Sequence, residues 1–301
     1  MARIAIVTGA ASGIGRALAT ALVARGDTVV VADIDGDGAG RVAGELARHG
    51  PGTAAPAMVD VRDAAAVRDL VDQARDTYGR LDLMMNNAGI GVGGEARELV
   101  LAHWDRVIDV NLRGVVHGVH AAYPLMIEQG SGHIVNTASL AGLLPSPGLT
   151  PYAMTKHAVV GLSLSLRAEA AAYGVRVTAV CPGVVDTPIL DTAGPDDLPK
   201  PALSGHTREV FRHFQPRFYA PGRLAQDVLR GIDRNAALVV APASARVAWY
   251  LWRYAPLVVT RMAARQLAWT RATFPAGQAG PAEPGLTVSG PRRTRRSPGP
   301  G

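Results

Sequence analysis

Tyr152 and Lys156 are the two residues whose types and spacing most directly suggest chemistry. On a helix, positions i and i+4 share a face, so the lysine ammonium can lie beside the phenol. A nearby positive charge favours the ionised phenol and lowers a tyrosine pKa from its ordinary value of about 10. Such a tyrosine can act as a general base toward an alcohol near neutral pH. The same spacing also arises by chance on surface helices, where the lysine is only solvated and the tyrosine half-buried.

Ser139 is the third residue with chemical potential, because of where it stands. It ends the apolar run 133–138, which predicts a buried strand. A serine at a strand end that faces the same point as Tyr152 can donate a hydrogen bond to a substrate oxygen as charge develops on it.

A glycine-rich turn near the beginning of the sequence predicts a phosphate site. The apolar run 3–7 is followed by Gly9, Gly13 and Gly15, and then by a helical pattern that closes at Gly26. Strand, glycine turn and helix are the context of a dinucleotide-binding fingerprint. Glycines let the backbone approach a pyrophosphate, and the helix N-terminus offers free N–H groups. A plain glycine turn is the alternative, and the position at the start of an α/β pattern disfavours it.

Asp33 indicates which dinucleotide is bound. It ends the predicted strand 28–32, roughly 20 residues after the glycines, where an acid can accept hydrogen bonds from ribose hydroxyls and repel a 2′-phosphate. No basic residue follows Asp33 directly, although Arg16 lies in the glycine helix. We therefore expect NAD rather than NADP, unless Asp33 is an ordinary loop acid.

Strand and helix patterns alternate along most of the chain, which predicts an α/β fold with a doubly wound parallel sheet, the Rossmann fold. The predicted strands are 3–7, 28–32, 54–59, 81–85, 133–138, 175–180 and 237–240. Helices are expected at 39–49, 63–78, 104–128, 152–173 and 224–230. Ligands bind at the carboxyl ends of parallel strands, and Thr8, Asp33, Asp60, Asn86, Ser139 and Pro182 all fall at such ends.

Composition narrows the class of protein. The chain has 301 residues, a formal charge of +6 and a single cysteine, Cys181, which excludes an intramolecular disulfide and predicts a buried, inert thiol. We see neither a basic-then-apolar leader nor an uncharged apolar stretch of membrane-spanning length, and so expect a cytoplasmic protein. The arginines of the run 292–296 favour a solvated end over nucleic-acid binding.

The motifs, taken together, resemble those of a known family. Along the chain stand Thr8-Gly9-x-x-x-Gly13-x-Gly15, Asp60, Asn86-Asn87-Ala88-Gly89, Asn111, Ser139, Tyr152-x-x-x-Lys156 and Pro182-Gly183. In this order and spacing, the sequence resembles single-domain short-chain dehydrogenases/reductases over residues 3–242. The resemblance implies reversible hydride transfer between NAD and a carbinol or carbonyl carbon, with no metal ion.

The resemblance also implies a role for each matching position. Tyr152 would be the general acid/base, Lys156 would hold the nicotinamide ribose and lower the tyrosine pKa, and Ser139 would orient the substrate oxygen. Asn111 would anchor a proton-relay water, or else merely bend its helix. The implied cofactor contacts are Gly9, Ser12, Gly13, Ile14, Gly15, Asp33, Asp60, Val61, Asn87, Ala88, Gly89, Tyr152, Lys156, Pro182, Gly183, Val185 and Thr187. Asn86 could equally serve to tie strands together.

The resemblance places a substrate lid at about 189–222, within the domain 1–242. Phe211, Phe214, Phe218 and Tyr219 would suit a sizeable apolar alcohol or ketone, but they could equally be core residues. The family's usual assembly is a tetramer through the helices that contain Trp104 and Tyr152, so we expect a homo-oligomer, tetramer or dimer.

Beyond Pro242 the chain departs from the minimal family pattern. Residues 245–274, within an extension at 243–274, have a helical period in which three tryptophans alternate with arginines. Such a basic amphipathic helix can lie on a membrane, but docking on a neighbouring subunit or on its own domain is favoured. Residues 275–301 are rich in Pro, Gly and Arg and are expected to be a disordered basic tail.

Two further classes of protein remain open. A cofactor-binding regulatory or scaffold protein could use the same fold without turnover, although the intact set of catalytic residues argues against it. An epimerase or dehydratase acting on a nucleotide sugar shares the Tyr-Lys pair, but it normally has other glycine spacing and a larger C-terminal domain.

Overall fold

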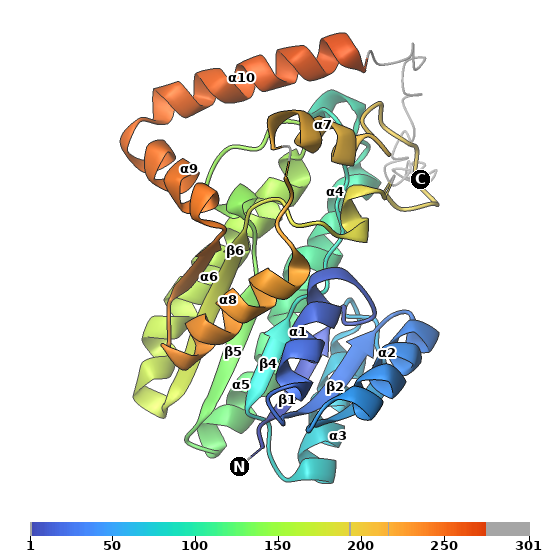
Figure 1. Ribbon diagram of the computed structural model, residues 1–301, viewed down its shortest axis with the longest axis vertical. Helices are drawn as coiled ribbons and strands as arrows, with labels where there is room; N and C mark the ends of the chain where they lie inside the picture. Colours follow the sequence, from blue (N-terminus) through green and yellow to red (C-terminus); the bar gives the residue numbers. More distant parts are fainter. Residues whose placement is uncertain (1, 193, 216, 275–301) are drawn as a thin grey trace, which may run out of the picture.

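The computed structural model describes residues 2–192, 194–215 and 217–274 (Figure 1). One seven-stranded, fully parallel sheet runs through it in the order β3-β2-β1-β4-β5-β6-β7. The strands are β1 Ile4–Thr8, β2 Thr28–Asp33, β3 Thr53–Met58, β4 Leu83–Asn86, β5 Gly132–Thr137, β6 Val175–Pro182 and β7 Leu238–Ala241. This confirms the doubly wound α/β fold, and the order reverses between β1 and β4, which is where such sheets bind ligands.

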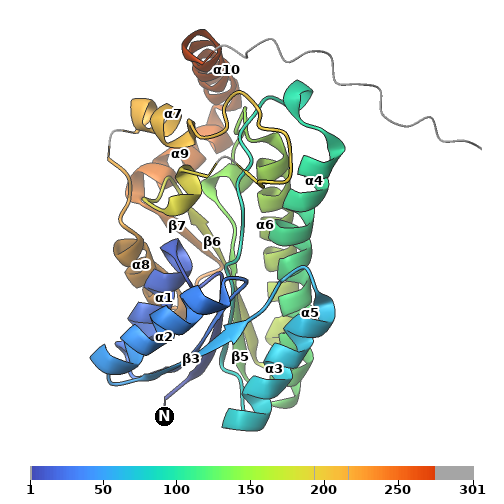
Figure 2. The same ribbon diagram turned by 90° about the vertical axis from the view of Figure 1, so that its right-hand side faces the viewer.

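Helices cover both faces of the sheet (Figure 2). They are α1 Gly13–Val23, α2 Gly36–His49, α3 Ala64–Tyr78, α4 Leu101–Ile108, α5 Gly114–Glu128, α6 Thr150–Ala170, α7 Thr207–Phe214, α8 Pro221–Asp233, α9 Ala243–Tyr254 and α10 Pro256–Thr273. Helices α1, α2 and α8 pack on one face, and α3, α5 and α6 on the other. The segments at the carboxyl ends of the strands are thus held by a sheet that is covered on both faces.

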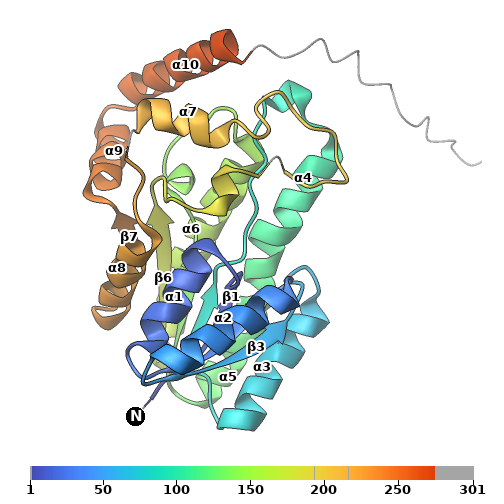
Figure 3. The same ribbon diagram turned by 45° about the vertical axis from the view of Figure 1, so that its right-hand side comes forward.

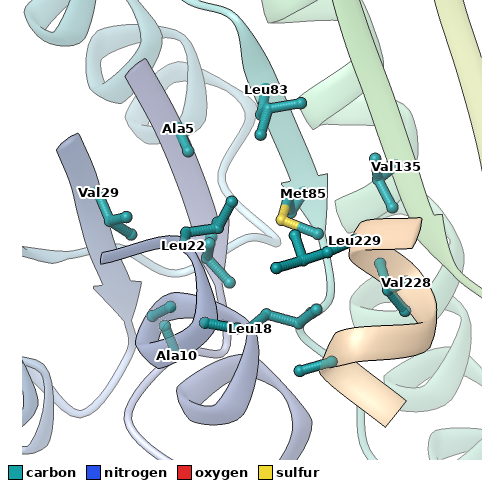
Figure 4. Packing of buried hydrophobic residues seen from close by; sticks show 14 of the residues in the cluster. Ala5, Ala10, Leu18, Leu22, Val29, Leu83, Met85, Val135, Val228 and Leu229 are labelled. Atoms are coloured by element: carbon teal, nitrogen blue, oxygen red, sulfur yellow. The ribbon is translucent and has the colours of Figure 1, made fainter. Parts of the chain in front are cut away.

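Side chains that alternate between the two faces of each strand form the two hydrophobic cores. In β1, Ala5 points into the core beneath α1 and α8, where Leu18, Leu22 and Leu229 also lie (Figure 4). Its neighbour Ile4 points into the opposite core. Successive side chains of a strand face opposite sides, so a strand covered on both faces reads as a continuous apolar run. This is why the short runs in the sequence predicted strands correctly.

The ends of helix α3 lie where the local sequence predicted them. The Asp63 carboxylate accepts hydrogen bonds from the backbone N–H groups of Ala65 and Ala66. At the other end Gly79 adopts φ 78°, a left-handed conformation that glycine tolerates best. Both ends were predicted from the sequence.

Two predicted helices differ in the structure. The expected helix 104–128 begins at Leu101 and contains a π-helical turn, Asp109–Arg113, between α4 and α5. The expected continuous helix 245–274 is broken into α9 and α10. Its break is at Ala255, whose φ of −136° and ψ of 59° are not helical, because a residue before proline avoids the α region.

The last helices lie over one end of the domain. Helix α10 runs across α7, far from the N-terminus (Figures 1 and 3). Within the described residues, no helix is both long enough and apolar enough to span a bilayer. The predicted disordered tail, 275–301, lies outside the described residues.

Candidate active site

A cleft of about 700 Å³ follows the carboxyl edge of the sheet and continues beneath α10. It brings together all but two of the site residues predicted from the sequence. Those that line it are Gly9, Ser12, Gly13, Ile14, Asp33, Asp60, Val61, Asn87, Ala88, Gly89, Ser139, Tyr152, Lys156, Pro182, Gly183, Val185 and Thr187. Gly15 and Asn111 do not line it, and both instead support residues that do.

The glycine turn is built to keep backbone close to the cleft. Gly9 and Gly13 have φ values of 66° and 53°, which side chains disfavour. A Cβ on Gly15 would lie 2.1 Å from the Gly9 carbonyl oxygen and 2.6 Å from the Asn87 amide nitrogen. Gly15 is therefore required for packing of α1 against the turn. No described side chain caps the start of α1 at Ser12, so its free N–H groups suit a pyrophosphate.

Asp33 lies in the cleft with its carboxylate held in place. One oxygen accepts from the Ala11 backbone N–H at 2.9 Å and the other from that of Asp35 at 3.0 Å. Arg16 is engaged elsewhere, 2.6 Å from Glu45, and does not line the cleft. The Asp33 carboxylate thus lines the cleft and makes no ion pair with Arg16.

Asp60 reaches the cleft already paired, which the sequence did not predict. The Arg62 guanidinium donates to both carboxylate oxygens, at 2.6 Å at the closest, and holds the pKa of Asp60 below its usual value. The neighbouring Val61 carbonyl accepts from the His117 ring at 2.9 Å. Arg62 and Arg106 both line this end of the cleft and were missed, because nothing in their local sequence marks them.

Asn86, the last residue of β4, and Asn87, which follows it, have different surroundings. The Asn87 amide donates to the Thr8 carbonyl at 2.9 Å and accepts from the Thr137 hydroxyl at 3.2 Å, which ties three strand ends together at the cleft. Asn86 is buried outside the cleft and donates to Asn136 at 2.8 Å. The strand-tying alternative for Asn86 therefore describes its place in the structure.

Lys156 is a buried cation against Tyr152. Its side chain is 3% exposed, and its Nζ lies 5.5 Å from the centre of the Tyr152 ring. The ammonium donates to the Thr137 carbonyl at 2.8 Å. Burial lowers the pKa of Lys156 from 10.5 to about 8, because the charged form is poorly solvated there.

The pKa of Tyr152 differs from the sequence prediction, which expected Lys156 to lower it. Burial in the cleft raises the pKa of Tyr152 above its ordinary value, and a hydrogen bond with the Ser139 hydroxyl acts in the opposite direction. Desolvation outweighs this hydrogen bond, because the phenolate loses more from leaving water than the hydrogen bond restores. A positively charged ligand in the cleft would shift this balance back toward the phenolate.

Asn111 sits in the π-helical turn and is fully buried. Its amide accepts from the Ile90 N–H at 2.8 Å and donates to the Ile90 carbonyl at 2.9 Å. It therefore clamps the loop after Gly89, whose missing Cβ would lie 3.2 Å from the Asn111 oxygen and 3.5 Å from the Lys156 nitrogen. Single π-turns inside helices are frequent at functional sites. The water-relay role of Asn111 stays a prediction.

The aromatic residues of the predicted lid have different surroundings: one lines the cleft, and the others contact residues of the protein outside it. Phe211 lines the cleft. Phe214 packs edge-on against Trp269 with ring centres 5.3 Å apart, and the Tyr219 hydroxyl donates to Asp227 at 2.6 Å. Phe218 lies near Arg208. Of these four aromatic residues, Phe211 lines the cleft and the other three do not, so each of the two alternatives left open by the sequence describes part of this segment.

Helix α10 forms a wall of the cleft that the sequence did not reveal. Gln266, Leu267 and Thr270 line it. The helix is fixed by the Arg271 guanidinium, which pairs with Glu95 at 2.6 Å, and by Trp269, stacked on the His213 ring of α7 at 3.9 Å. Docking on its own domain is thus confirmed for one face of α10. Sequence spacing shows which residues share a face, but it cannot show where that face docks.

Other titratable groups agree with the expected chemistry. Burial raises the pKa of the Cys181 thiol to about 12, so the thiol is inert as predicted. No cluster of three or more His, Cys, Asp or Glu residues suited to a metal ion occurs in the part of the chain that the structure describes.

Comparisons with known proteins agree with this geometry. The family profile described as short chain dehydrogenase matches residues 3–197. The probable oxidoreductase EphD of Mycobacterium tuberculosis (strain ATCC 25618 / H37Rv) is 38% identical over 240 residues, which cover 78% of this chain and 40% of that protein. The chain thus spans about two fifths of the length of that relative.

An uncharacterized oxidoreductase of Staphylococcus aureus (strain MRSA252) is 39% identical over 198 residues, 66% of this chain and 84% of that protein. The crystal structure of a short-chain dehydrogenase/reductase from Burkholderia phymatum in complex with NAD is similar with a TM-score of 0.76 and 32% identity. The match covers 84% of this chain and 93% of that one. The chain belongs to the short-chain dehydrogenase/reductase family of oxidoreductases.

Proposed function

We propose that the protein is an NAD-dependent enzyme that transfers a hydride between the nicotinamide and the carbinol or carbonyl carbon of an apolar secondary alcohol or ketone. One observation carries this proposal: Ser139, Tyr152 and Lys156 meet in the cleft whose other end contains the glycine turn and Asp33. The residues present fit a dinucleotide. The free N–H groups at the start of α1, the Asp33 carboxylate and the buried Lys156 ammonium follow one another along the cleft.

The roles follow from position and chemistry. NAD, when bound, supplies the hydride acceptor and a positive charge. In the oxidising direction, Tyr152 takes the hydroxyl proton of the alcohol, and Ser139 donates a hydrogen bond to the substrate oxygen. Lys156 donates hydrogen bonds to the cofactor ribose and favours the phenolate electrostatically. In the reducing direction, Tyr152 returns the proton.

Asp33 supports NAD over NADP. Its two fixed oxygens suit ribose hydroxyls, and its charge opposes a 2′-phosphate. Arg16, the basic residue of the glycine helix, is already paired with Glu45. The NAD bound in the Burkholderia phymatum structure also favours this choice.

Asp33→Asn should shift the ratio of NADPH to NADH affinity toward NADPH by roughly tenfold, because it removes the negative charge that opposes a 2′-phosphate. Asp35→Asn is the matched control: Asp35 lies two residues away and caps α2, outside the cleft. Binding constants from fluorescence titration would measure both. An unchanged ratio in Asp33→Asn would contradict the assignment.

The substrate end of the cleft is apolar. Besides Phe211, it is lined by Leu144, Pro145, Leu149, Ile189, Leu203 and Leu267. A ketone or alcohol with a sizeable apolar group would bury that group there.

Leu267→Ser should raise KM for bulky apolar ketones by roughly tenfold and leave KM for NADH unchanged. Its neighbour Ala268 is exposed on the same helix, so Ala268→Ser makes a matched control. If both variants behave like the wild type, α10 does not contact the substrate.

A titration with NADH and NADPH, followed by a panel of secondary alcohols and ketones monitored by nicotinamide absorbance, tests the function as a whole. We expect preferential NADH binding and turnover of bulky apolar substrates. Binding without turnover on any substrate would favour a regulatory or scaffold protein instead.

We also propose a homo-oligomer, tetramer or dimer, formed through α4, α5 and α6. Exposed apolar side chains on these helices support this proposal. They are Val116 on α5 and Met154 and Leu164 on α6, each about 40% exposed. Light scattering should give a multiple of the chain mass, and a monomer would contradict the proposal.

A further inference from the structure

The junction of α9 and α10 carries a concentrated apolar surface, here called the corner surface. Its exposed side chains are Val247, Tyr250, Leu251, Tyr254, Leu257, Val258 and Met262. Tyr254 is 80% exposed and Leu257 70%. On α9 they recur at intervals of three and four residues, and on α10 Val258 and Met262 are four apart, so each set forms a stripe on its helix. Exposed apolar patches of this kind mark interaction sites.

Arginines flank these stripes and have no acidic partner in the described part of the chain. Arg246, Arg253, Arg261 and Arg265 are exposed, and none makes an ion pair with another described residue. No aspartate or glutamate occurs between Asp233 and Glu283. Helices α9 and α10 thus combine exposed apolar side chains with positive charges and carry no acidic residue.

The inward faces of the same helices are already used by the fold. Trp249 packs against the core beside Val240 and Ala245, and Trp269 stacks on His213. Two of the three tryptophans that suggested a membrane helix from sequence, Trp249 and Trp269, therefore contact the domain itself. The outward side chains are tyrosines and aliphatic residues, and within the described chain they contribute nothing to the core.

We propose that the corner surface binds an anionic lipid surface. Its apolar side chains would insert shallowly at the boundary of headgroups and acyl chains, as they do in interfacial helices. The arginines would extend their stems along the apolar layer and place their guanidinium groups on lipid phosphates.

A second copy of the chain fits this surface less well. A two-fold contact brings the same patch of both copies together, so cationic side chains would face cationic side chains with no acid between Asp233 and Glu283 to offset them. The inference stands independently of turnover.

Co-sedimentation of the full chain with vesicles tests the proposal. We expect binding to vesicles of phosphatidylcholine mixed with phosphatidylglycerol, weakening as salt is added, and little binding to phosphatidylcholine alone. The double variant Arg261→Glu, Arg265→Glu should bind at least roughly 30-fold more weakly. Leu257→Ser with Met262→Ser should also weaken binding, because apolar insertion is lost.

Two control variants test whether vesicle binding depends on the corner surface or on positive charge elsewhere in the chain. Arg48→Glu with Arg68→Glu makes the same charge change on α2 and α3, at exposed positions outside the corner surface, and should bind nearly as well as wild type. Substituting serine for Arg292, Arg293, Arg295 and Arg296 tests the basic end of the chain, and most binding should survive. NADH titration verifies that each variant is folded.

Three results would overturn the proposal. The first is no binding to the anionic vesicles. The second is binding that survives in the corner variants and is lost when the arginines of 292–296 are replaced. The third is a change of oligomeric size in the Leu257→Ser, Met262→Ser variant with no vesicle binding by the wild type, which would assign the surface to a second copy.

Discussion

Replacing Tyr152 by phenylalanine is expected to lower kcat by roughly 10²- to 10⁴-fold. The change removes the phenol oxygen and keeps the ring that lies 5.5 Å from the Lys156 ammonium. Binding of NADH should therefore persist, because the turn at Gly9 and the acid at Asp33 are untouched. Steady-state rates with the best substrate of the panel, together with NADH titration, measure the two quantities separately.

Tyr173→Phe is the matched control for this change. Tyr173 is 51% exposed, just beyond the end of α6, so the same loss of a hydroxyl should leave both quantities unchanged. If Tyr152→Phe keeps its turnover within about tenfold of wild type, general acid/base catalysis by this residue is excluded, since such catalysis contributes at least about 10².

Replacing Lys156 by methionine is expected to stabilise the fold while it reduces activity. In the folded protein, burial lowers the Lys156 pKa from 10.5 to about 8. That difference corresponds to about 3 kcal/mol of unfavourable free energy for the protonated side chain at neutral pH. The variant also loses the hydrogen bond to the Thr137 carbonyl, which lowers its stability by about 1 kcal/mol. The unfolding free energy should therefore rise by about 2 kcal/mol, whereas kcat/KM should fall roughly 10²-fold or more.

The pH dependence of this stabilisation has a definite sign. Between pH 8 and 10.5 the unfolded chain holds a proton on Lys156 that the folded chain has lost, so wild-type stability gains from this group as pH rises. Below pH 8 the cost of burying the charge is fully present. Above 10.5 both states are neutral and the cost disappears. The advantage of Lys156→Met should thus be largest at neutral pH and shrink toward pH 10.5.

Lys200, the other lysine of the chain, offers a control. It is 39% exposed and pairs with Asp196 at 3.2 Å. Lys200→Met should produce neither a gain in stability nor a large loss of activity. Denaturant unfolding at several pH values, with no cofactor added, measures the stabilities. A Lys156→Met protein less stable than wild type at pH 7 would contradict the cost of burial.

The sequence alone was enough to predict the sheet, the glycine turn and the convergence of Ser139, Tyr152 and Lys156. These features depend on short-range patterns: apolar runs for buried strands, Asp63 and Gly79 for the ends of a helix, and glycines where no Cβ fits. Parallel topology then places the strand ends at one edge of the sheet, so Asp33 and Ser139 had to lie along the same edge. Two residues four apart on a helix had to share a face, as Tyr152 and Lys156 do.

Tertiary structure alone decided how these groups are solvated and what closes the cleft. The pKa of Tyr152 is raised because the surrounding elements exclude water, and spacing along the chain carries no information on that. Phe211 faces the cleft while Phe214 faces Trp269, although both belong to one aromatic run. Helix α10 could be anticipated as amphipathic, but its docking depends on contacts with Glu95 and His213. Such pairings join residues far apart in sequence, and only the folded chain brings them together.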